Sequence, residues 1–174
     1  EPVTGFVVGD ITVGNGSASA FAGSGANYTI NVTPAGDGTV TVDVAADVAQ
    51  DGSSNGNTAA SQFSIVYDGS APSVTISSII TGPTNASPIA VRIDFNEPVT
   101  GFVVGDITVG NGSAGDFAGS GANYTINVTP AGDGTVTVDV PADVAQNAAL
   151  VNNTAASQFS IVYDGSAPTV SISS

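Results

Sequence analysis

Residues 89–95 read IAVRIDF, and apolar side chains occupy every second position, at Ile89, Val91, Ile93 and Phe95. A period of two residues is the pattern of a β-strand that buries one face. The same alternation is found on both sides of this segment. It predicts further strands at residues 73–77, 106–109, 115–119, 124–128, 136–140 and 159–163.

Residues that favour turns separate these segments, in the strings TGPTNASP, GNG, GSGAN and PAGDG. Gly, Pro, Asn and Asp favour the tight turns that join neighbouring antiparallel strands. Seven short strands with one apolar face each predict an all-β fold, in which two antiparallel sheets pack face to face. The expected core contains Val91, Ile93, Phe95, Ile126, Val136, Val138, Phe159 and Ile161.

The sequence repeats itself at an offset of 96 residues. Residues 1–78 align with residues 97–174 and differ at 11 positions, of which six are contiguous and separate DGSSNG from NAALVN. The string YDGSAP occurs twice and marks a module boundary, because Gly-Ser followed by Ala-Pro ends one extended segment and begins another without a flexible linker. The predicted division is a partial module at residues 1–70 that lacks its first strands, a complete module at 71–166, and the first strand of a following module at 167–174.

The composition excludes most catalytic chemistry. The chain has no Cys, His, Lys, Met or Trp, and its only cation is Arg92. A Ser-His-Asp site, a Cys-His site and a Schiff base therefore cannot be assembled. A glycosidase needs only two carboxylates, but the chain has no Trp to form a sugar platform. The sequence thus predicts that the chain is not an enzyme.

The net charge of −14 limits the kinds of molecule that the chain can bind. It repels nucleic acid and anionic lipid, and no apolar run is long enough to span a bilayer. The charged partners that fit are cations. Calcium fits best, since it is bound by carboxylate, amide and carbonyl oxygens.

Five acids are the candidate calcium ligands. In a sandwich of this topology, the loop acids lie at the end of the module where the preceding module joins, and Asp68 sits on that junction. The predicted ligands are Asp68, Glu97, Asp106, Asp139 and Asp143. The alternative is that Asp68 is a turn residue and the other four are solvated acids.

The first module carries an equivalent acidic set. Its members are Glu1, Asp10, Asp43 and Asp47, with Asp51, Asn55 and Asn57 in the loop that differs between the copies. The change of DGSSNGN to NAALVNN puts a metal site in that loop of the second module in doubt. Asp37 and Asp133 lie in PAGDG turns and are expected to be structural.

The strings DFNEPVTGF, DITVGNG, YTINVTP and DGTVTVDV, with the YDGSAP junction, resemble the bacterial immunoglobulin-like repeats of large surface adhesins, including biofilm-associated and RTX-type adhesins. The resemblance implies immunoglobulin-like two-sheet antiparallel sandwiches in tandem, in an extracellular protein at the cell surface. It also implies modules that join end to end as a stiff extender, often with calcium.

Three functions stay open at this stage. The first is a structural extender of a secreted or surface adhesin or fibre, whose partners are neighbouring modules. The second is an adhesion module that binds a glycan or a protein. The third is a subunit of an extracellular filament, in which residues 167–174 complete the first module of another copy head to tail. The rival to that third function is that the chain is a window cut from a longer covalent array.

Overall fold

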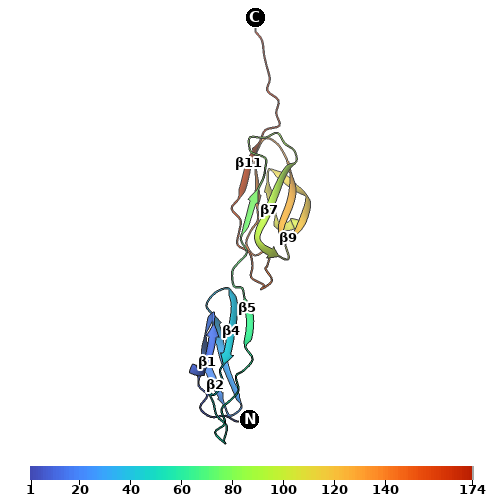
Figure 1. The fold of residues 1–174 in the computed structure, drawn as a ribbon. Helices are drawn as coiled ribbons and strands as arrows, with labels where there is room; N and C mark the ends of the chain where they lie inside the picture. The colour runs from blue at the N-terminus through green and yellow to red at the C-terminus, as the bar shows by residue number, and fades with distance from the viewer. Residues whose placement is uncertain (174) are drawn as a thin grey trace. The chain divides into compact units, whose positions relative to one another are not determined.

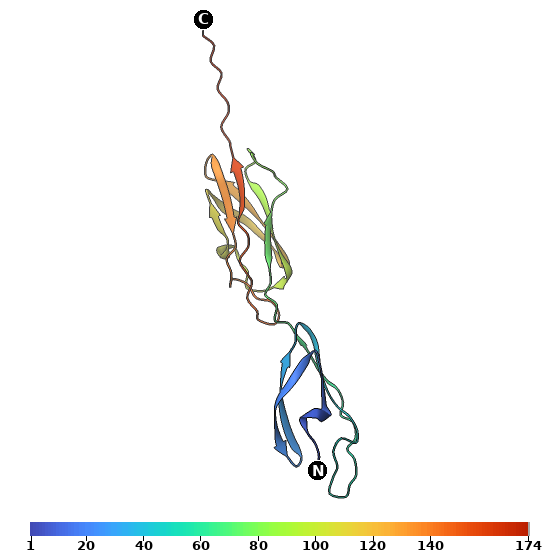
Figure 2. The same cartoon turned by 90° about the vertical axis from the view of Figure 1, so that its left-hand side faces the viewer.

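The computed structural model describes residues 1–173, and the chain forms two compact units, Glu1–Ser70 and Ala71–Ser174. Paired β-strands provide nearly all the regular structure of each unit (Figure 1, Figure 2). The only helical elements in the described part of the chain are two short 3-10 turns, η1 (Val8–Asp10) and η2 (Val104–Asp106).

The second unit is a two-sheet sandwich. One sheet has the strand order β6-β7-β9 and the other has the order β11-β10-β8. All their pairings are antiparallel. The strands are β6 (Val74–Ser77), β7 (Ile89–Val99), β8 (Thr108–Gly110), β9 (Gly112–Pro130), β10 (Gly134–Asp139) and β11 (Phe159–Tyr163).

Strand β9 doubles back on itself at the predicted GSGAN turn. A Cβ atom placed on Gly119 would lie 2.2 Å from the carbonyl oxygen of Asn123, so the two limbs of β9 run closely side by side. The turn passes through Gly121, whose φ of 64° suits glycine. Each limb therefore acts as a separate strand, as the sequence predicts.

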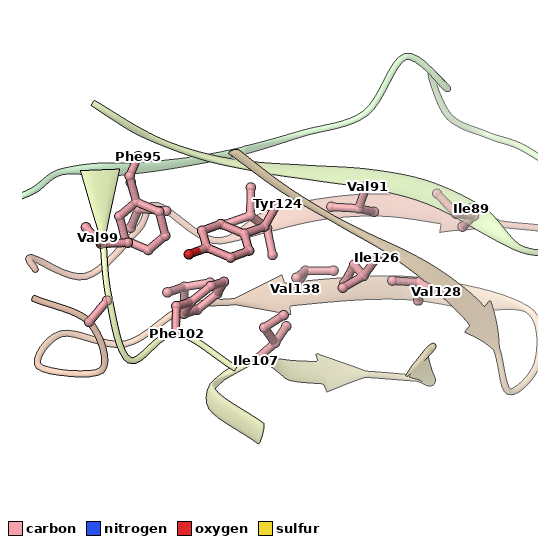
Figure 3. Close-up of a cluster of buried hydrophobic side chains, with 14 of the residues drawn as sticks. Ile89, Val91, Phe95, Val99, Phe102, Ile107, Tyr124, Ile126, Val128 and Val138 are labelled. Carbon is pink, nitrogen blue, oxygen red and sulfur yellow. The ribbon is translucent and has the colours of Figure 1, made fainter. Parts of the chain in front are cut away.

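The core lies between the two sheets of this unit. The central pairings place apolar residues opposite each other, Val91 with Ile126 and Val136 with Ile161. Phe95, Phe102 and Tyr124 pack edge to face at one end of the cluster (Figure 3). Every predicted core residue is buried except Phe159, which is half-buried and packs against the others. The predicted all-β sandwich is confirmed.

Several predicted strands have different bounds in the structure. The strand expected at residues 106–109 begins at Thr108, because Asp106 belongs to η2. The Asp106 carboxylate accepts the N–H of Val103 at 2.8 Å and so closes that turn. Strand β7 continues to Val99, four residues beyond the alternation of residues 89–95.

Residues 167–173 form no strand. Val170 and Ile172 are 90% and 96% exposed. The last residue of the segment predicted to open a following module, at position 174, lies outside the described residues. The assignment of this segment to a following module stays a prediction.

The first unit contains the counterparts of β8 to β11. Its sheets have the orders β1-β4-β5 and β2-β3. The strands are β1 (Ile11–Gly14), β2 (Gly16–Ser24), β3 (Asn27–Pro34), β4 (Gly38–Val44) and β5 (Phe63–Tyr67). Within residues 1–70 there is no counterpart of β6, and only the end of β7 has one, at Val3, which forms a bridge with Gly25. Strand β3 therefore pairs on one side only, with β2.

Candidate functional site

The five predicted calcium ligands are divided between the two units. Asp68 belongs to the first unit, and the other four belong to the second. No three carboxylates of the described residues form a group that could hold a metal ion. The predicted grouping of Glu97, Asp106, Asp139 and Asp143 is therefore not found within the second unit, and calcium binding stays a prediction.

Two of these acids accept hydrogen bonds that shape their own unit. Asp106 caps η2 through the N–H of Val103. Both carboxylate oxygens of Asp139 accept from the side-chain amide of Gln158, at 3.0 and 2.9 Å. Asp143 has a left-handed backbone, with φ of 64°, and its N–H donates to the carbonyl of Asn153. These contacts favour a structural role for the three residues.

The loop that differs between the two copies is held by a buried asparagine. Asn153 is 2% exposed, and its side-chain oxygen accepts the N–H groups of Val144 and Ala145. Its amide nitrogen donates to the carbonyls of Pro141 and Thr154. Asn57 makes the equivalent four hydrogen bonds in the first unit. Its side-chain oxygen and nitrogen are therefore both engaged by the protein backbone.

The six consecutive differences between residues 51–56 and 147–152 leave the turn in this loop unchanged. Asp51 accepts the N–H groups of Ser53 and Asn55, and Asn147 accepts those of the equivalent residues in the second unit. The Asn55 side chain and backbone hold the pKa of Asp51 below its usual range. A short oxygen acceptor at this position is therefore what the loop requires, and both Asp and Asn supply it.

A carboxylate in the PAGDG turn of each unit holds the point where the chain leaves that unit. Asp133 accepts the N–H of Gly165 at 2.7 Å and also the hydroxyl of Ser166. In the first unit, Asp37 accepts from Gly69 and Ser70 in the same way. We call each set the exit clamp. It gives Asp37 and Asp133 the structural role expected from the sequence.

Hydrogen bonds lower the pKa of the carboxyl group in both exit clamps. The Ser166 hydroxyl, and next the Gly165 N–H, hold the pKa of Asp133 below its usual range. Ser70 and Gly69 do the same for Asp37. Both interactions favour the charged carboxylate, so each clamp is formed when the acid is ionised.

The chain is also anchored where it enters the second unit. Pro72 is fully buried, and its carbonyl accepts the N–H of Thr154 at 2.9 Å. The next residue, Ser73, donates its N–H to the side chain of Asn96 at 2.7 Å. Ser70 is held in the first unit and Pro72 in the second, so Ala71 is the one residue between two anchored positions.

One large pocket offers no catalytic groups. It has a volume of about 540 Å³ and lies in the second unit, between residues 78–83 and 159–162 together with Thr135. Its lining contains no titratable side chain. A carboxylate pair of the kind that a glycosidase needs is thus absent from this cavity.

A family model described as the bacterial Ig-like domain matches residues 1–67 and again residues 68–163. The chain belongs to this family. Bacterial Ig-like domains are typically non-catalytic modules, and they usually occur in extracellular or surface proteins. No curated protein shows a significant match to the chain. None of the helical elements in residues 1–173 is long and apolar enough to cross a membrane.

Sequence reasoning missed the partners of both anchors of the bacterial Ig-like units. The exit clamp joins Asp133 to Gly165 and Ser166, which are 32 and 33 positions later in the chain. These residues come together only because β10 pairs with β11. The carbonyl of Pro72 accepts hydrogen bonds from Thr154, which is 82 positions away. The strings PAGDG and YDGSAP both occur in each copy, which is the one sign in the sequence that they matter. Their repetition does not indicate that the two strings are in contact.

Proposed function

We propose that this chain is a structural extender segment of an extracellular, repetitive surface protein. Near-identical Ig-like units follow one another without a flexible linker and hold another part of the protein away from the cell. The observation that carries the proposal is the pair of anchors around Ala71. Ser70 is clamped by Asp37, and Pro72 is buried and bonded to Thr154.

A short, doubly anchored connection restricts bending, because a flexible linker needs several free residues. In contrast, the chain offers little for ligand recognition. Residues 1–70 are almost identical to residues 97–166, and the aromatic side chains of each unit pack mostly with one another. The acidic composition keeps such repeats soluble and apart from nucleic acid and anionic lipid. The proposal includes no catalytic activity.

Arrays with different numbers of the 96-residue repeat test this role. Their hydrodynamic length should rise in proportion to the number of repeats if the units form a stiff extender. A length that rises only with the square root of that number would show a flexible chain and contradict the proposal.

A screen of the chain against glycan and protein arrays addresses the alternative adhesive function. The extender role predicts no specific ligand. Saturable binding that is lost when surface loops are changed would favour an adhesion module instead.

A further inference from the structure

The loop at residues 51–56 of the first unit contains the dipeptide Asn55–Gly56, and both of its residues are exposed to solvent. In an Asn-Gly dipeptide the backbone nitrogen of the glycine can attack the side chain of the asparagine, because glycine has no Cβ atom to hinder the approach. The equivalent residues of the second unit are Val151 and Asn152. This loop therefore offers the reactive dipeptide in the first unit only.

The backbone nitrogen of Gly56 is available for such a reaction. Gly56 lies opposite Gln50 in an isolated bridge, whose hydrogen bonds are made by the neighbouring residues. One of them joins the N–H of Asn57 to the carbonyl of Ala49 at 2.9 Å. In the part of the chain that the structure describes, the N–H of Gly56 itself donates no hydrogen bond.

The side chain of Asn55 is held by Asp51. Its amide nitrogen donates to one carboxylate oxygen of Asp51 at 2.9 Å, and the backbone N–H of Asn55 donates to the other at 2.9 Å. We call these two hydrogen bonds the Asp51–Asn55 latch. Both partners lie in one loop, so the latch can open without separating any strands.

The two other Asn-Gly dipeptides of the chain are fixed by the surrounding turns and strands. Asn15 lies between β1 and β2, and its side-chain amide donates to the carbonyl of Gly36 at 2.9 Å. Its own carbonyl accepts the N–H of Ala35 at 3.0 Å, which ties this turn to the turn between β3 and β4. Asn111–Gly112 is held in the same way. Attack at these two sites requires a pair of turns to separate.

We propose that Asn55 is a site of spontaneous deamidation. The nitrogen of Gly56 bonds to the side-chain carbon of Asn55, and its proton passes through water to the amide nitrogen, which leaves as ammonia. The resulting five-membered succinimide ring adds one water at either of its carbonyl carbons and opens to aspartate or isoaspartate. This modification goes beyond the extender role and does not depend on it.

The product cannot close the latch again. The amide that donated to Asp51 is replaced by a carboxylate, and two neighbouring carboxylates repel each other. Asp51 also accepts the N–H of Ser53 at 2.8 Å, so displacement of its side chain releases the turn. Deamidation therefore adds a negative charge to the first unit and opens this loop irreversibly.

Incubation of the full 174-residue chain in heavy-oxygen water at mildly alkaline pH, followed by peptide mapping with mass spectrometry, tests the site. Asn55 should convert at least about tenfold faster than Asn15 and Asn111, because a loop opens at a lower free energy than paired strands. Each product should carry one heavy oxygen from the opening of the ring. Asn55→Gln should give no product at this position over the same period, since its longer side chain forms no five-membered ring.

Three further variants test the latch. Asp51→Ala removes the acceptor of the Asn55 amide and should speed conversion by at least about twofold. Ser53→Ala is the matched control, because it changes the same loop and keeps both hydrogen bonds of the latch, and it should leave the rate unchanged. Asn55→Asp reproduces the charge of the product, and hydrogen exchange should show lost protection at the N–H of Ser53.

Three results would overturn the proposal. The first is conversion at equal rates at Asn55, Asn15 and Asn111, which would mean that the fold does not select the site. The second is an unreacted Asn55 after a period in which a free peptide of residues 50–60 has converted. The third is an unchanged rate in Asp51→Ala together with full protection of the Ser53 N–H in Asn55→Asp.

Discussion

Ile65 and Ile161 are equivalent residues of two strands with the same sequence, and their exposed fractions are 56% and 6%. The difference arises because Ile161 belongs to the buried core of the second unit and lies against the segment at residues 80–83, which has no counterpart in residues 1–70. The two sites therefore form a natural pair for measuring what this packing contributes to stability.

We expect Ile161→Ala to lower the free energy of unfolding of the second unit by about 2–5 kcal/mol, because it removes buried methyl groups and leaves a cavity. Ile65→Ala should change the stability of the first unit by less than about 1 kcal/mol. Urea unfolding followed by hydrogen exchange in each unit measures both values. Equal losses at the two sites would mean that Ile65 is buried in solution.

Asn153→Ala should destabilise the second unit by at least about 2 kcal/mol. The substitution leaves the buried N–H groups of Val144 and Ala145 without an acceptor. Asn152→Ala is the matched control, because Asn152 is the exposed neighbour, and its effect should stay within about 0.5 kcal/mol. Thermal unfolding of the three proteins provides the comparison. A neutral Asn153→Ala variant would show that this asparagine does not hold the loop.

Acid should open the exit clamps. The folded pKa of Asp133 lies below its usual value, so the clamp adds stability above the unfolded pKa and loses it as the pH falls through the folded pKa. We expect the amide resonance of Gly165 to titrate with a midpoint below the usual pKa range of an aspartate. Ser166→Ala removes the largest cause of the shift, so the midpoint should rise towards the usual value. An unchanged midpoint would contradict the role of the hydroxyl.

Calcium binding is the prediction from the sequence that the structure leaves open. If the predicted ligands, Asp68, Glu97, Asp106, Asp139 and Asp143, bind the ion, its dissociation constant should be on the order of 10⁻⁴–10⁻³ M, as in other extracellular modules. EDTA should then lower the melting temperature, and Asp68→Asn should reduce that effect. No change on addition of either calcium or EDTA at physiological salt would remove calcium from the account.

The sequence was sufficient to predict the sandwich, because alternation is a local signal. The alternating apolar residues of two strands lie in the core, because every second side chain of a strand points to the same face. They are Val91, Ile93, Val136 and Val138. Turn strings such as PAGDG also have local causes, and their positions between strands were predictable. Asp106 shows the limit of this reasoning, since its hydrogen bond to Val103 replaces the start of the expected strand with a 3-10 turn.

The contacts around the candidate site were less predictable, because they join positions far apart in the chain. Asp139 was predicted as a calcium ligand, and the sequence did not indicate that it also accepts two hydrogen bonds from Gln158, 19 positions later. The pairing of Asp133 with Gly165 and Ser166 likewise depends on how two neighbouring strands end. Charge and spacing in the sequence identified the carboxylates, but they did not identify the residues that donate hydrogen bonds to them.

In the proposed extender, anchors on both sides of Ala71 restrict bending between consecutive units. The chain has no Cys, so Ser53→Cys and Ser120→Cys introduce one dye site in each unit for single-molecule energy transfer. We predict a narrow distance distribution for the parent chain and a broader one after Asp37→Ala with Ser70→Ala. Asp133→Ala with Ser166→Ala is the matched control, because it opens the clamp beyond the second unit and should leave the distribution narrow. A parent distribution as broad as that of the Asp37→Ala/Ser70→Ala chain would contradict the extender account.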